Sequence, residues 1–170
     1  LDGGIEAVTT KVLDWFRNSV QPASPLEKPR SGLESVRLGV TAEGPVPEKI
    51  ATACAQLIAS IVREGGTAVI PHNSSLLAAE GFRHHLLAAP EASPSLAYGQ
   101  PFRKPGFHVM ETPTDHQVEI LTGLGATGVE VMLAHITNRS LQAQPLVPLI
   151  QFSFGTDASS PLNPGDDLDL

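Results

Sequence analysis

The stretch Gly106–Gly125, GFHVMETPTDHQVEILTGLG, constrains the fold more than any other part of the chain. Its first residues alternate between opposite faces, as in a strand, and Thr112-Pro113 then interrupt the pattern. A helix begins after Thr114 or Asp115, either of which can cap it. A strand that leads directly into a helix places polar groups at the carboxyl end of a sheet, where ligands bind in open α/β folds.

The rest of the chain alternates between segments with strand patterns and segments with helical patterns. Strands are expected at about 36–41, 67–71, 129–135 and 146–154, the last at a sheet edge because of its prolines. Helices are expected at about 5–19, 48–64 and 76–88. This alternation favours an α/β domain with a largely parallel sheet of about five strands and helices on both faces. A two-layer α+β arrangement is the alternative.

Three segments are predicted to lack regular structure. Residues 21–32 form a proline-rich connector, and residues 156–170 form an acidic, proline-broken tail that is expected at the surface. Residues 89–105 form the longest loop, which is either a functional flap or the place of a deletion. The chain begins at LDGG without a methionine, which suggests a processed product or a piece of something longer.

Composition excludes several classes of partner. The formal net charge is −7 and no run of Lys or Arg occurs, which argues against nucleic acid and anionic membranes. No segment approaches the roughly 20 apolar residues of a membrane span. The one cysteine, Cys54, falls on the apolar stripe of its predicted helix, with Ile50, Leu57 and Ile58. It is therefore interpreted as a core residue of a cytoplasmic protein in a reducing compartment.

Polar residues follow the predicted strands, and in a parallel sheet they would meet at one edge. One hypothesis is a divalent metal held by His72, Glu111 and His135, with Asp115 or His116 as general base. The alternative is that such residues are solvated turn residues that cap helices. The polar residues at the expected strand ends are Thr41, Glu43, His72, Asn73, Glu111, Thr112, His135, Thr137, Asn138 and Ser153.

The string Gly123-x-Gly125-x-x-Gly128 matches the dinucleotide-binding pattern, but it follows a helix and precedes a strand. The fingerprint requires the opposite order, so this string is interpreted as a helix C-cap and a tight turn. No phosphate-binding GxxxxGK[ST] and no G-x-S-x-G nucleophile elbow occurs.

Several segments, in order, resemble the altronate dehydratase and galactarate dehydratase family, which also contains a sulfolactate lyase. The central GFHVMETPTDHQVEILTGLGATG is similar to that family's MDTPG…TG segment, and GGIEAVTTKVLDWF to the helix that opens its C-terminal catalytic region. LIASIVREGGTAVIPHNSSLLAAEG is similar to a helix, a Gly-Gly-Thr strand and an Ala-Glu turn of the family. GVEVMLAHITNRS takes the place of its Thr-Thr-Gly-Arg-Gly turn, and GDDLDL that of its Asp-Asp-Met-Asp-Ile ending.

The resemblance implies removal of water, or a related leaving group, from a hydroxylated sugar acid. The implied chemistry is proton abstraction next to a carboxylate with help from a divalent metal such as Fe, Mn or Mg. Residues 111–113 take the places of the family's Asp-Thr-Pro, and Arg139 would grip the substrate carboxylate after a one-residue shift from the aligned Asn138. The implied catalytic residues are Glu111, Asp115 and His116, and the implied substrate-binding residues are Asn73, Thr112, Thr137, Asn138 and Arg139.

The chain also departs from the family. His72–Ser75 replaces a Glu-Thr-Pro-Glu turn and loses both carboxylates, and the family's Asn-Pro-Ser-Pro-Gly-Asn-Lys segment is absent after Glu80. A second interpretation is therefore a non-catalytic ligand-binding or assembly domain that keeps the fold. A separate subunit that carries the family's other domains, or a homo-oligomer, is a possible partner under either interpretation.

Overall fold

The computed structural model describes residues 4–19, 32–86, 93–137, 141–142 and 145–153. They belong to two compact units, Leu1–Arg30 and Ser31–Leu170. The first unit contains one helix, α1 (Gly4–Ser19), which confirms the helix predicted at about 5–19. The tail 156–170 and, apart from Gly32, the connector 21–32 lie outside the described residues. None of the described helices is long and apolar enough to cross a membrane.

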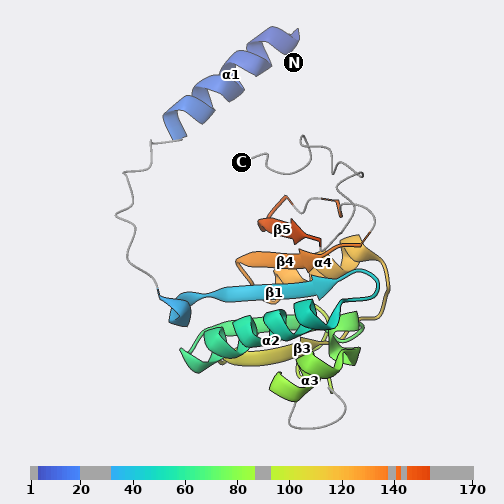
Figure 1. Ribbon diagram of the computed structural model, residues 1–170. Coiled ribbons are helices and arrows are strands. Elements are labelled where there is room, and N and C mark those ends of the chain that lie inside the picture. Colours follow the sequence, from blue (N-terminus) through green and yellow to red (C-terminus); the bar gives the residue numbers. More distant parts are fainter. Residues whose placement is uncertain (1–3, 20–31, 87–92, 138–140, 143–144, 154–170) are drawn as a thin grey trace. The chain divides into compact units, whose positions relative to one another are not determined.

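The second unit is built on one sheet in which every neighbouring pair of strands is parallel (Figure 1). The order across the sheet is β3-β2-β1-β4-β5, which confirms the predicted α/β class with a five-stranded parallel sheet. Strand β5 lies at an edge, as its prolines predict, and begins directly after Pro148. The strands are β1 (Arg37–Ala42), β2 (Thr67–Pro71), β3 (Gly106–Met110), β4 (Val131–His135) and β5 (Leu149–Phe152).

The strand order contains one reversal of direction. The chain steps outward from β1 to β2 and β3, and then crosses to the other side of β1 to form β4. In doubly wound sheets, ligands bind outside the carboxyl ends of the strands near such a reversal, because the loops on its two sides diverge there. The fold therefore directs attention to the residues that follow β1 and its neighbours.

Helices cover both faces of the sheet. Helices α2 (Glu48–Arg63) and α3 (Glu80–Leu86) pack together over one face, and α4 (Gln117–Ala126) covers the other (Figure 1). Strand β2 is buried on both sides: Ala68 and Ile70 join the core under α2, whereas Val69 packs in the core under α4. Cys54 is buried as predicted, but Leu57, placed on the same stripe, is 41% exposed.

The segment predicted as one helix at 76–88 consists of two shorter pieces in its described part. A 3-10 helix, η2 (Ser75–Ala78), ends at extended Ala79 before α3 begins. A side chain from another element fixes this second start, because the Glu48 carboxylate accepts a hydrogen bond from the Gly81 N–H. The helix-to-helix contact thus caps α3, and a cap supplied from 33 residues away has no local sequence signal.

Residues 93–105 form the described part of the predicted long loop, and they contain neither helix nor strand. This segment is held against the α4 side of the sheet by Leu96, which forms a parallel bridge with Met110. The Tyr98 hydroxyl donates to the Glu119 carbonyl at 2.7 Å, and the Phe102 N–H donates to the Thr127 carbonyl at 3.1 Å. These contacts give the segment a packing role.

The glycine string has the role that its position predicts. Gly123 and Gly125 lie within α4, and Gly128 follows the helix with a φ of 98°, a conformation that favours glycine. A side chain at Gly123 would overlap the Tyr98 ring, so the absence of a Cβ there allows the 93–105 segment to approach α4. The string therefore serves packing and helix termination.

Candidate functional site

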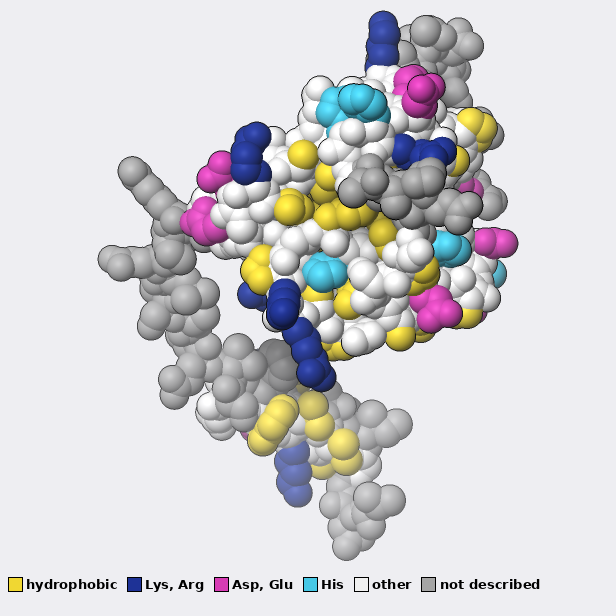
Figure 2. All heavy atoms as spheres, turned by 90° about the horizontal axis from the view of Figure 1, so that it is seen from below, with side chains coloured by type: hydrophobic (Ala, Val, Ile, Leu, Met, Phe, Trp, Pro, Cys, Tyr) yellow, Lys and Arg dark blue, Asp and Glu magenta, His cyan; other side chains and the backbone are white. Residues whose placement is uncertain are grey.

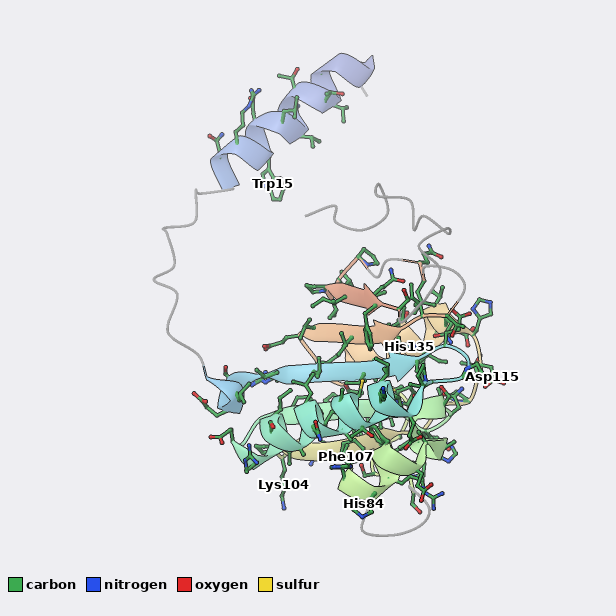
Figure 3. The ribbon with its side chains drawn as sticks, viewed as in Figure 1. Trp15, His84, Lys104, Phe107, Asp115 and His135 are labelled. Atoms are coloured by element: carbon green, nitrogen blue, oxygen red, sulfur yellow. The ribbon has the colours of Figure 1, made fainter. Side chains whose placement is uncertain are left out.

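A small cavity of about 150 Å³ opens at the carboxyl edge of the sheet. We call it the Asp115 pocket. It is enclosed by the loops that follow β1, β2 and β3, together with the first turns of α4. Figure 3 shows Asp115 on the side toward which the strand arrows point, and Lys104 on the opposite side. The lining residues are Thr41, Ala42, Glu43, Gly44, Asn73, Ser74, Ser75, Asp115, Gln117 and Ile120.

Hydrogen bonds tie the β1 loop to its neighbours on both sides. The Ser75 hydroxyl donates to the Gly44 carbonyl at 2.6 Å, which joins the loops after β1 and β2. On the other side, the Thr137 hydroxyl donates to the Glu43 carbonyl at 2.8 Å, and the Glu43 N–H donates to the His135 carbonyl at 2.9 Å. The loop that carries Glu43 is therefore held from both directions, with little freedom to collapse into the pocket.

Asn73 connects the loops after β2 and β3. Its side-chain amide donates to the Asp115 carboxylate at 2.8 Å and to the Thr114 carbonyl at 3.1 Å. The Thr114 hydroxyl in turn accepts the His116 N–H at 3.0 Å, just before α4 begins. Asn73 thus orients the Asp115 carboxylate at the pocket, while the remaining oxygen lone pairs of that carboxylate stay available to a ligand.

Two pocket residues have buried polar atoms with no hydrogen-bond partner among the described residues. They are the Ser74 hydroxyl oxygen and the Gln117 side-chain oxygen. Ser74 stands at the N-cap of η2 without making a side-chain cap, and it is only 6% exposed. Buried polar groups in native proteins are nearly always paired, so an unpaired set beside a cavity indicates a missing ligand or water.

The structure brings some of the predicted site residues together. Asn73 and Asp115 both line the pocket, and Thr137 supports it through Glu43. Glu111 is exposed at the end of β3, the Thr112 hydroxyl donates to the Met110 carbonyl at 3.3 Å, and His116 is exposed at the start of α4. The pocket lining includes none of these three residues. Asn138 and Arg139 lie outside the described residues.

The proposed metal ligands are not gathered into one cluster. His72 and Glu111 are exposed and follow the neighbouring strands β2 and β3, whereas His135 ends β4, on the far side of β1. Among the described residues, no group of three or more His, Cys, Asp and Glu side chains is arranged to hold a metal ion. The set His72, Glu111 and His135 therefore does not fit a common metal.

Sequence reasoning missed Ser74, Ser75 and Gln117 as lining residues. The pattern predicts Ser74 and Ser75 as helix caps, because hydroxyl residues before a helix usually have that role. Gln117 carries no signal, since a glutamine in a first helical turn is ordinary on an exposed face. Only the convergence of three loops places these side chains around one cavity.

His135 is a buried support and does not line the cavity. Its side chain is 2% exposed, its ring stands at 68° to that of Phe152 with centroids 5.5 Å apart, and its Nδ1 has no partner among the described residues. Burial lowers the pKa of the imidazole below its usual 6.5, because desolvation disfavours the charged ring. Figure 3 shows His135 near the carboxyl end of β4.

The lowered pKa predicts a loss of stability in acid. The unfolded chain takes up a proton at His135 near pH 6.5 and the folded chain only at lower pH, so folding is favoured fully above pH 6.5. The melting temperature should fall as the pH drops below 6.5, and the variant His135→Gln should lose that part of the pH dependence. The exposed His84 gives a matched control, since His84→Gln should retain it. An unchanged pH profile in His135→Gln would contradict a neutral buried imidazole.

The surface around α3 and β3 carries charges of both signs. Figure 2 views the molecule from that side, and its basic and acidic side chains are interspersed without one broad positive area. A broad positive area is what nucleic-acid binding requires. This face therefore gives no support to a nucleic-acid partner, in line with the net charge of −7.

No protein-family model matches the chain, and no curated protein sequence is similar enough to count as a relative.

Proposed function

We propose that the chain is a divergent C-terminal domain of a sugar-acid dehydratase of the altronate and galactarate type, and that it binds a small hydroxy acid at the Asp115 pocket. The observation that carries this proposal is the convergence of Asn73, Ser74 and Asp115 around one cavity at the carboxyl edge of a parallel sheet. Its volume of about 150 Å³ suits a ligand of a few carbons and is well below the range of drug-sized sites.

The proposed reaction is elimination of water. Asp115 accepts the proton from the carbon next to the ligand carboxylate, and the electrons of that C–H bond form a carbon–carbon double bond as the neighbouring C–O bond breaks. The hydroxyl leaves as water after His116 donates a proton to it, and the enol product becomes a keto acid. Arg139 is assigned to the ligand carboxylate from the family resemblance. No step is assigned to a metal, because the described residues do not form a suitable ligand set.

A second candidate is binding without chemistry. It is favoured by the turn His72–Ser75, which lacks both carboxylates of the family's corresponding turn, and by the exposed position of Glu111 away from the pocket lining. In that case the domain would hold the same hydroxy acid for a catalytic subunit. Under either candidate the single buried Cys54 supports a reducing, cytoplasmic location.

The proposal predicts stabilisation by sugar acids. At a ligand concentration of 100 times Kd, folding should gain about 2.7 kcal/mol, which raises the melting temperature by roughly 5–10 °C. Galactarate and altronate should produce this shift in the intact chain, and a keto acid should appear on incubation if the chain is a lyase. Stabilisation without product would select the second candidate. No stabilisation by any hydroxy acid would contradict both.

A further inference from the structure

We propose that the Asp115 pocket recognises the hydroxyl-bearing carbon chain of its ligand and leaves the ligand carboxylate outside. An uncharged polyol of the same stereochemistry should then bind about as well as the acid. This inference deepens the proposed function and rests on it, since it takes the same pocket as the binding site.

The charge of the lining is the first reason. Two carboxylates, Glu43 and Asp115, face the cavity, and no Lys, Arg or His stands among the described lining residues. An ionised ligand carboxylate would meet like charges there without a described cation to offset them. Hydroxyl groups have no such penalty, and they form charge-assisted hydrogen bonds with carboxylates.

The hydrogen-bonding character of the lining is the second and independent reason. The buried Gln117 side-chain oxygen has no partner among the described residues, and as an acceptor it requires a donor. The carboxylates of Glu43 and Asp115 are also acceptors. A ligand hydroxyl can donate to each of these, whereas an ionised carboxylate has no hydrogen to donate. The unpaired Ser74 hydroxyl can then donate to the same ligand oxygen or accept from it.

A third feature is the supply of donors from the protein. The Asn73 amide is already engaged by Asp115 and Thr114, and the Ser75 hydroxyl donates to the Gly44 carbonyl. The strongest described donors beside the pocket are therefore already used within the loops. What remains is a surplus of acceptors, which is the complement of a polyol.

Three probes with the same six-carbon skeleton separate the possibilities. Galactarate carries four hydroxyls between two carboxylates, galactitol replaces the carboxylates by hydroxymethyl groups, and adipate keeps the carboxylates without hydroxyls. Calorimetry on the intact chain should give galactitol a Kd within about threefold of that of galactarate, and should give adipate one at least roughly tenfold weaker. Raising the salt concentration should tighten galactarate and leave galactitol unchanged, because salt screens the like charges.

A charge-removing variant provides the matched test. Asp115→Asn should improve the affinity for galactarate relative to galactitol by a few-fold, since it removes one like charge from the pocket. Glu64→Gln removes the same charge at an exposed residue after α2 and should leave that ratio unchanged. If galactarate and adipate bind while galactitol does not, the inference is wrong and the proposed function stands. If none of the three binds, the proposed function fails as well.

Discussion

Asp115→Asn is expected to lower galactarate turnover by about 10²–10⁴-fold, the usual contribution of a positioned general base. The amide keeps the size of the side chain and its place beside Asn73, but it cannot accept the proton from carbon at neutral pH. Binding of galactarate should survive, since the introduced amide would still accept and donate hydrogen bonds in the pocket. The measurement is the initial rate of keto-acid formation, together with a calorimetric Kd for the same preparation.

The control for this variant is Glu64→Gln, which removes an equivalent charge far along the sequence from the pocket loops and should retain full turnover. Asn73→Ala gives an intermediate case. It leaves the Asp115 carboxylate in place but removes the amide that orients it, so turnover should fall less than in Asp115→Asn. Equal turnover in Asp115→Asn and in the unaltered chain would remove Asp115 from the mechanism.

Phe82→Ala is expected to destabilise the sheet unit by about 3–5 kcal/mol, the range found when a fully buried aromatic side chain is truncated. Phe82 has no exposed surface and belongs to the core between α2, α3 and the sheet, where its ring centroid is 6.4 Å from that of Phe107. Loss of the ring leaves a cavity and removes the packing that holds α3. The measurement is urea unfolding followed by circular dichroism.

Phe82→Leu is the conservative partner of this variant and should cost far less, because leucine fills most of the same space. A truncation of exposed Leu57 to alanine gives a second comparison on the same face of the sheet, and its effect should be within about 0.5 kcal/mol. A cost below about 1.5 kcal/mol for Phe82→Ala would show that the site relaxes, and that α3 depends on other contacts.

The sheet could be predicted from the sequence because its signals are local. The run Thr67–Pro71 is apolar on both sides and bounded by Gly66 and a polar turn, which is the pattern of a strand buried on both faces. Pro148 marks the edge strand because it has no N–H for a ladder bond, and its carbonyl accepts the Met132 N–H at 2.8 Å. Each of these features depends only on neighbouring residues.

The site was harder to predict because its contacts are long-range. The Asn73 amide meets Asp115 across 42 positions, and Thr137 meets Glu43 across 94, so no local pattern reveals either pair. The strand ends correctly indicated the edge of the sheet. They did not indicate which side chains turn inward: Asp115 lines the pocket, whereas Glu111, only four residues earlier, is exposed. His135 was placed at that edge as a ligand, but its apolar surroundings make it a buried support.

The central claim is that a small hydroxy acid binds between the loops after β1, β2 and β3. Backbone amide chemical-shift mapping by NMR during a galactarate titration tests it most directly. The account predicts that the saturable shifts concentrate at 41–44, 73–75 and 115–117, and that Gly65 and Lys104 at the other end of the sheet remain still. Saturable shifts confined to residues elsewhere, with those three segments unchanged, would contradict it.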